Sequence, residues 1–263
     1  MNYIVWEASP AIFSIGDFQL RWYSVMFVIS FSFSLKYMKK IYEAQGKDIA
    51  LLDPLFYYVI SGTIIGARLG HCLLYEPEYY LNKPVEILMV WKGGLASHGG
   101  AVGILFALGF FCRKHKEPLF SLLDDLSIPI ALSASLIRVG NFFNSEIIGH
   151  QTTVPWAIIF KRVDDYPRHP AQLYEALAYL IIFLVLISIK SKFGVKLNQG
   201  KMIGFLILFI FMVRLWIEFF KIRQESYDTT WILNTGQLLS IPFIIVGLFL
   251  CLRKNLNPSE NKL

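Results

Sequence analysis

The sequence predicts an all-α integral membrane protein with seven transmembrane helices, and three observations support this fold class. The chain has 263 residues, of which 55% are hydrophobic, and its mean hydropathy is +0.51. Its apolar residues gather in runs of roughly 17–25 residues, the length that crosses a bilayer as a helix. Short polar stretches rich in Lys and Arg separate these runs. A soluble domain of this size has no core large enough for so much apolar surface, so we expect a lipid bilayer to cover it.

Seven runs are candidate spans, and we expect them at residues 22–38, 51–75, 94–112, 119–137, 173–189, 202–220 and 236–252. Asp124 and Asp125 interrupt the start of the fourth run, which favours Asp124 as a helix N-cap. In the second run, glycines recur every four residues, a stripe typical of close helix packing (Gly62, Gly66 and Gly70). Residues 1–20 lack the basic start of a cleavable signal peptide and favour an interfacial arm before the first span.

The placement of Lys and Arg predicts the orientation of the spans, because cytoplasmic loops carry an excess of both. The stretches after spans one, three, five and seven hold the basic residues Lys36, Lys39, Lys40, Lys47, Arg113, Lys114, Lys116, Lys190, Lys192, Lys196, Lys201, Arg253, Lys254 and Lys262. Few acidic residues accompany them, so we expect the N-terminus outside and the C-terminus in the cytoplasm. The basic residues are dispersed over short loops, whereas nucleic-acid binding predicts one clustered basic face.

The chain reads as a single integral membrane domain over residues 1–263, with its longest non-helical stretch at residues 138–172. By the predicted orientation this stretch forms a small extracytoplasmic head between helices four and five, and the run 156–160 within it is strand-like. The three cysteines lie in apolar runs without CxxC spacing and are best explained as structural residues (Cys72, Cys112 and Cys251).

Ionisable residues collect at the outer ends of the predicted spans, where charge is costly and usually functional. They are Tyr23, Arg68, His71, His98, Arg138, His169, Glu175, Arg214 and Glu218. Structural alternatives remain for most of them. Arg68 can pair with Glu76 or Glu78, Arg214 with Glu218 on the same helix face, and His98 can be a packed histidine. Three arginines at one membrane depth nevertheless predict an anionic ligand, and a lipid phosphate fits a guanidinium fork well.

Arg138 is the hardest to explain by stability alone. Polar residues and glycine follow it directly, in what we expect to be a break from helix (Gly140, Asn141, Asn144 and Glu146). Glycine and asparagine suit a turn whose backbone N–H groups point into a site.

The stretch 138–149 resembles the signature of the prolipoprotein diacylglyceryl transferase family. Six further ordered motifs resemble those of the same family, at residues 21–23, 66–70, 93–100, 169–175, 214–220 and 236–240. The chain departs from the family pattern at Ser24, at Ile210 and over residues 221–226.

The resemblance implies a multi-pass enzyme of the bacterial cytoplasmic (inner) membrane, with its active site toward the outer leaflet and without a metal or cofactor. It implies transfer of the sn-1,2-diacylglyceryl group from phosphatidylglycerol to the lipobox cysteine of a prolipoprotein. The products are a thioether and glycerol-1-phosphate.

On this reading Arg138 and Arg214 face the phosphate, and Glu218 orients one of them. Asn141, Glu146 and Gly149 shape the headgroup site, while Tyr23 and Arg68 add substrate contacts. His98 is the candidate base for the thiol, in competition with a thiol acidified by the arginines. A phospholipid or anion transporter using the same arginines is the alternative, but no second polar cluster or inverted repeat favours it. A photoreceptor needs a Schiff-base lysine in the last span, which has none.

Overall fold

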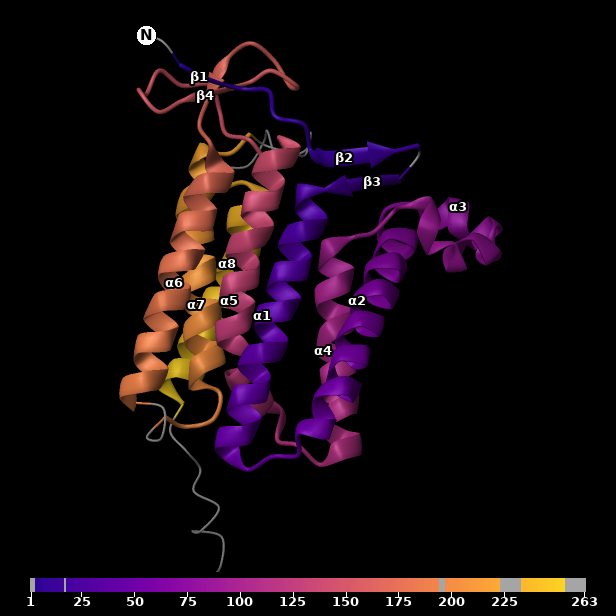
Figure 1. Cartoon of the computed structure of the whole chain (residues 1–263), viewed down its shortest axis with the longest axis vertical. Coiled ribbons are helices and arrows are strands. Elements are labelled where there is room, and N and C mark those ends of the chain that lie inside the picture. The colour runs from indigo at the N-terminus through magenta and orange to yellow at the C-terminus, as the bar shows by residue number, and fades with distance from the viewer. Residues whose placement is uncertain (1–2, 17, 194–196, 223–232, 254–263) are drawn as a thin grey trace, which may run out of the picture. The chain divides into compact units, whose positions relative to one another are not determined.

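The computed structural model describes residues 3–16, 18–193, 197–222 and 233–253, and this part of the chain is mainly helical (Figure 1). Each of its seven long helices overlaps one of the predicted runs, although several of their ends differ. They are α1 (Trp22–Gln45), α2 (Leu52–Leu74), α4 (Ser97–His115), α5 (Leu119–Asn144), α6 (Ala171–Phe193), α7 (Lys201–Ile217) and α8 (Thr235–Leu252).

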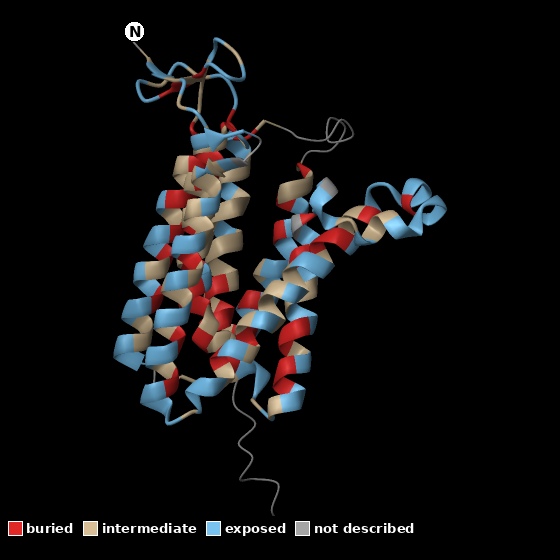
Figure 2. Cartoon of the chain, turned by 45° about the vertical axis from the view of Figure 1, so that its right-hand side comes forward, coloured by how far each residue is buried: buried red, intermediate tan, exposed pale blue. Residues whose placement is uncertain are grey.

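Five helical segments of the described chain are long and apolar enough to cross a membrane: Ile49–Leu74, Leu119–Asn144, Ala171–Phe193, Lys201–Phe220 and Thr235–Leu252. Their outward-facing side chains include many large apolar residues, such as Leu184, Phe243 and Phe249, each about half exposed or more. Figure 2 shows exposed residues along the outer faces of these helices. Such surface is far larger than a water-soluble monomer leaves uncovered. The protein is therefore a multi-pass membrane protein, and the spanning of α1 and α4 stays a prediction.

The chain divides into two compact units, one formed by Met1–Tyr37 with Leu123–Leu263 and the other by Met38–Leu122. We call them the head-bearing unit and the glycine-packed unit and describe each by itself. That the whole chain acts as a single membrane domain stays a prediction.

In the head-bearing unit, helices α5 to α8 lie side by side (Figure 1). Their core is built from Ile128, Ala131, Tyr179, Ile182, Leu186, Met202, Ile203, Leu206 and Leu250. Asp124 lies inside α5 and is not the N-cap that the sequence favours. Its carboxylate instead accepts hydrogen bonds from Gly200 N (2.7 Å) and Ile203 N (2.9 Å), at the start of α7. These N–H groups have no partner within their own helix, so a carboxylate from another helix caps them.

The head of this unit contains a small sheet of order β1–β4–β5, formed by β1 (Ile4–Trp6), β4 (Ile158–Phe160) and β5 (Pro167–Arg168). The strand-like run 156–160 thus contains a real strand. β1 is parallel to β4, and β4 is antiparallel to β5. A separate antiparallel hairpin joins β2 (Ala11–Ile15) to β3 (Phe18–Arg21). Phe142, Ile148, Ile158 and Phe160 form a second apolar core beneath the first sheet, which ties the head to the end of α5.

Helix α5 runs on to Asn144, whereas the sequence predicts a break at Arg138. Asparagine and glycine are poor helix formers, but tertiary packing overrides propensity here. A side chain at Gly140 would collide with the ring of Tyr23, 2.6 Å from an added Cβ, so glycine lets α1 approach. Trp22 of α1 stacks on Phe143 with ring centroids 4.7 Å apart. The non-helical head therefore begins at Ser145.

In the glycine-packed unit, α2 and α4 meet through their glycines, as the spacing of four predicts. An added Cβ on Gly66 would lie 2.4 Å from Gly99 O and 2.7 Å from Gly103 Cα. Short helices connect α2 to α4: α3 (Pro77–Asn82), η2 (Pro84–Leu88) and η3 (Val90–Lys92). An apolar groove of about 730 Å³ runs along α2 and α4, and its lining includes Tyr57 and His98.

Candidate active site

Arg138 lies in the last two turns of α5, and two side chains hold its guanidinium. Its Nε forms an ion pair with Glu175 Oε2 at 3.0 Å, and its Nη1 donates to Asn141 Oδ1 at 3.2 Å. Asn141 follows Arg138 by three residues, so the helix places both on one face. Within the described chain no partner binds Nη2, and the side chain is 18% exposed. The end of the fork is therefore available to an anion.

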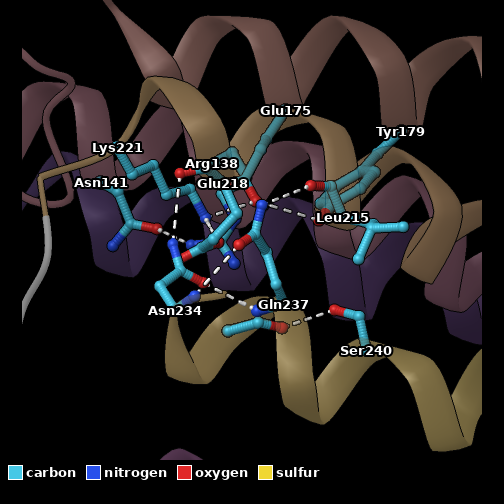
Figure 3. Close-up of polar contacts among 11 residues, drawn as sticks. Arg138, Asn141, Glu175, Tyr179, Leu215, Glu218, Lys221, Asn234, Gln237 and Ser240 are labelled. Atoms are coloured by element: carbon cyan, nitrogen blue, oxygen red, sulfur yellow. Dashed lines mark hydrogen bonds and ion pairs between the residues drawn. The ribbon is translucent and has the colours of Figure 1, made fainter. Parts of the chain in front are cut away.

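Glu175, in the second turn of α6, is fully buried and lies within polar contact of three side chains. Besides Arg138, Lys221 Nζ lies 2.9 Å and Tyr179 Oη 3.2 Å from its Oε1. Lys221 also donates to Glu218 Oε2 at 3.0 Å (Figure 3). A buried carboxylate is tolerated only when cations and hydrogen bonds replace its water. Two cations and two carboxylates thus form one chain of contacts.

Glu146, just beyond α5, is held by neighbouring amides. Its Oε2 accepts from Asn141 Nδ2 at 3.0 Å and its Oε1 from Asn144 Nδ2 at 3.2 Å. The buried Gln172 donates to the Glu146 backbone carbonyl at 2.6 Å. Ser145 and Ile147, on either side of Glu146, have positive φ angles of 56° each. Residues other than glycine rarely adopt this backbone conformation. The structure thus holds this carboxylate close to Arg138 through the shared partner Asn141.

Gly149 and Tyr23 also belong to this neighbourhood. Gly149 N donates to His169 O at 2.9 Å, and an added Cβ would lie 2.5 Å from the His169 Cβ and 2.6 Å from Phe220 O. Position 149 must therefore be glycine for its backbone to lie this close to His169 and Phe220. The Tyr23 hydroxyl is within electrostatic range of Arg138 and Glu146. Their predicted substrate contacts stay proposals.

Arg214 and Glu218 do not form the ion pair that their spacing allows. Helix α7 ends at Ile217, and Glu218 begins a 3₁₀ turn, η5 (Glu218–Phe220), where it pairs with Lys221. The Arg214 Nε is buried and has no hydrogen-bond partner within the described chain. Arg214 and Arg138 are both within electrostatic range of Tyr179. The head-bearing unit therefore brings two of the predicted arginines to one region.

The start of α8 packs beneath Glu218. Asn234 caps α8 by accepting from Gln237 N at 2.8 Å, and the Gln237 side chain accepts from Asn234 N at 3.0 Å (Figure 3). This reciprocal pair is a capping box. An added Cβ on Gly236 would lie 2.5 Å from the Glu218 carboxylate. Gly236, in the last family motif, therefore leaves room for the carboxylate of Glu218.

In the glycine-packed unit, Arg68 is 2% exposed and binds backbone carbonyls in place of Glu76 or Glu78. Nε donates to Ile87 O at 3.0 Å, Nη2 to Glu86 O at 2.5 Å and Nη1 to Gly93 O at 2.5 Å. It therefore fixes the connection between α2 and α4, and its predicted contact with substrate stays a proposal. His71 lies 3.7 Å from Glu76, and His98 is an exposed residue that lines the apolar groove.

His169 lies just before α6 and faces the head. Its Nδ1 lies 3.0 Å from Tyr174 Oη, which also accepts from Trp156 Nε1 at 2.7 Å. Burial, followed by the nearby charge of His150, lowers the pKa of His169 below its usual value of 6.5. The imidazole is therefore kept neutral near neutral pH.

The sequence reasoning missed Lys221 and Gln172. It gave Glu175 no catalytic or substrate-binding role but considered it as an internal partner of the arginines, which its ion pair with Arg138 confirms. Glu175 and Gln172 lie in a motif that the sequence displays, but their burial is a tertiary property. Lys221 follows the Glu218 motif in a stretch that departs from the family pattern. Over the described residues no group of three His, Cys, Asp or Glu side chains is arranged to hold a metal ion.

Comparison with known proteins identifies the family. The model of the family "Prolipoprotein diacylglyceryl transferase" matches residues 10–253. A phosphatidylglycerol–prolipoprotein diacylglyceryl transferase of Chloroherpeton thalassium is 48% identical over 250 residues, which cover 95% of this chain and 93% of the relative. The enzymes of the same name from Tolumonas auensis and Bacteroides fragilis are 43% and 40% identical, over 95% and 94% of this chain and 96% and 93% of their own lengths. The chain belongs to the prolipoprotein diacylglyceryl transferase family.

Proposed function

We propose that this chain transfers the sn-1,2-diacylglyceryl group of phosphatidylglycerol to the lipobox cysteine of a prolipoprotein. Its family and the names of its relatives support a transferase with this donor and acceptor and disfavour the transporter alternative. The observation in the site that carries the proposal is the guanidinium of Arg138. Its Nε pairs with Glu175 and its Nη1 donates to Asn141, whereas Nη2 has no partner within the described chain.

In the proposed reaction the substrate thiolate attacks the glyceryl carbon that bears the phosphate. A carbon–sulfur bond forms, the carbon–oxygen bond to phosphate breaks, and the electron pair leaves on the oxygen of glycerol-1-phosphate. The enzyme needs no nucleophile of its own. Its task is to neutralise the leaving phosphate, and a planar guanidinium suits this by donating two parallel hydrogen bonds.

Each predicted residue has a role in this proposal. Arg138 and Arg214 bind the phosphate, and Glu218 orients Arg138 through Lys221 and Glu175. Asn141, Glu146 and Gly149 shape the site of the headgroup glycerol, and Tyr23 contacts it. Arg68 adds a contact to the substrate, and His98 is the proposed base for the thiol, whose ordinary pKa is about 8.5.

The proposal also includes the finer predictions of topology. We place the protein in the bacterial cytoplasmic membrane with seven spans, the N-terminus outside and the C-terminus in the cytoplasm. The head and the arginine site then lie toward the outer leaflet. The excess of Lys and Arg on the opposite side supports this orientation.

The test is mass spectrometry of a synthetic lipobox peptide after incubation with the purified protein and phosphatidylglycerol in mixed micelles. We expect the peptide to gain one diacylglyceryl group and glycerol-1-phosphate to appear in equal amount. A peptide with serine in place of the cysteine should gain nothing. If the folded protein leaves the cysteine peptide unchanged, the proposed function is wrong.

A further inference from the structure

Lys221 holds a buried ammonium between two carboxylates. Its Nζ lies 2.9 Å from Glu175 Oε1 and 3.0 Å from Glu218 Oε2, and its side chain is 6% exposed (Figure 3). Lysine is almost never buried without a partner, and here it has two. Glu175 is itself shared, because its other oxygen faces Arg138.

The charges of this chain of contacts balance. Arg138 and Lys221 supply two positive charges, and Glu175 and Glu218 supply two negative ones. Without the ammonium, one guanidinium would face the whole charge of the buried Glu175. Attraction between opposite charges is strong where water is excluded. Arg138 would therefore bind Glu175 more tightly and an incoming phosphate less well.

The backbone of Lys221 pairs with the loop that carries Gly149. Lys221 and Gly149 form an isolated antiparallel bridge. On either side of it, His150 N donates to Phe220 O at 2.8 Å and Ile222 N donates to Ile148 O at 3.3 Å. A single residue is thus connected through its side chain to the anchor of Arg138 and through its backbone to the loop that carries Gly149.

We infer that Lys221 is a positioning residue for diacylglyceryl transfer. Its ammonium carries part of the charge of Glu175, which leaves the Nη2 of Arg138 to the phosphate, while its backbone pairs with the loop that carries Gly149. This inference rests on the proposed role of Arg138. It concerns a residue in a stretch where the chain departs from the family pattern.

The experiment compares variants that remove the charge with one that keeps it. Lys221→Met and Lys221→Gln are neutral, whereas Lys221→Arg retains a cation that can reach both carboxylates. For each purified variant we would measure kcat and KM for phosphatidylglycerol and the inhibition constant of glycerol-1-phosphate, per amount of folded protein. We expect the neutral variants to lose about tenfold or more in kcat/KM and in affinity for glycerol-1-phosphate, and the arginine variant to stay within about threefold.

Lys190→Met is the matched control. Lys190 pairs with the nearly buried Asp125 at 2.7 Å, near the opposite end of α6 from Glu175. Removing it breaks a comparable ion pair without touching the chain of contacts around Arg138. We expect a lower unfolding temperature and an unchanged kcat/KM.

Two results would overturn the inference: folded neutral variants with the kcat/KM of the unmodified protein, or a folded Lys221→Arg variant as impaired as Lys221→Met. If the neutral variants do not fold, the arginine variant decides, because the inference requires it to remain active. Failure of the proposed function is distinguishable, since the unmodified protein would then form no thioether at all.

Discussion

The Nε of Arg138 lies 3.0 Å from Oε2 of Glu175, a carboxylate with no exposed surface. This contact engages Nε. Of the two terminal nitrogens, Nη1 donates to Asn141 Oδ1, and Nη2 has no partner within the described chain. An arginine at the end of a membrane helix thereby becomes a fixed donor for an anion, because a buried carboxylate can leave this position only at a high cost in free energy.

Replacement of Arg138 by lysine should nearly abolish transfer. An ammonium can pair with Glu175, but it cannot also present a planar fork to phosphate. We expect kcat/KM to fall by about a hundredfold or more, which corresponds to about 2.7 kcal/mol of transition-state stabilisation. Thioether formation on the lipobox peptide measures this loss, and thermal unfolding verifies that the variant is folded. A lysine variant within tenfold of the unmodified enzyme would remove the fork from the mechanism.

Replacement of His98 by glutamine tests the assignment of the base. If His98 accepts the thiol proton, its protonation causes the fall of kcat/KM at low pH, and glutamine should flatten this acidic limb. The measurement is kcat/KM for the peptide as a function of pH. His115, in the same unit, provides the control, and His115→Gln should leave the profile unchanged. An unaltered acidic limb in the His98 variant would favour the competing account, in which nearby arginines acidify the thiol.

Gly66 and Gly109 form a matched pair for the packing of α2 against α4. A methyl group at Gly66 would collide with the backbone of Gly99 and Gly103, whereas nothing lies within 4 Å of one at Gly109. We expect Gly66→Ala to destabilise the protein by about 1–3 kcal/mol, the cost of overpacking. Gly109→Ala should be neutral or stabilise by up to about 1 kcal/mol, because alanine favours helix. Thermal unfolding in detergent compares them, and equal effects would contradict the close approach.

His169 should make the stability of the head depend on pH. Because the folded state lowers its pKa below 6.5, the unfolded state binds the proton more readily. The stabilisation is therefore complete above about pH 6.5 and is lost as the pH falls through the folded pKa. Asp164, whose pKa the hydrogen bond from Arg168 holds below 3.8, titrates below this range.

We expect the unfolding temperature to decrease between about pH 7.5 and pH 5.5, and His169→Gln to reduce that decrease. His150, whose charge contributes to the shift, supplies the second variant: His150→Gln should diminish the pH dependence in part. If His169→Gln has the same pH dependence as the unmodified protein, another group is responsible.

The long helices could be predicted from the sequence because hydropathy over a run of residues is a local property. The residues at which these helices end could not be predicted in this way. Arg138 follows an apolar run and precedes Gly140 and Asn141, which reads as the end of a helix. The structure continues α5 to Asn144, because Tyr23 and Trp22 of α1 pack against this last turn.

The partners of several charged residues could not be predicted from their neighbours in the sequence either. Arg68 has acidic residues nearby in sequence but binds the carbonyls of Glu86, Ile87 and Gly93. Asp124 reads as the cap of its own helix and instead caps α7. Each of these contacts joins parts of the chain that only folding brings together.

The sequence by itself determined that the chain enters a membrane, where its long helices lie and which family it belongs to. These properties follow from the order of apolar residues and from motifs that are read residue by residue. Only the tertiary structure decided that Glu175 anchors Arg138, that Lys221 connects Glu175 to Glu218, and that Arg214 does not pair with Glu218. The physical reason is that a buried charge must be compensated, and its partner is whichever opposite charge the packing of separate helices brings within about 3 Å.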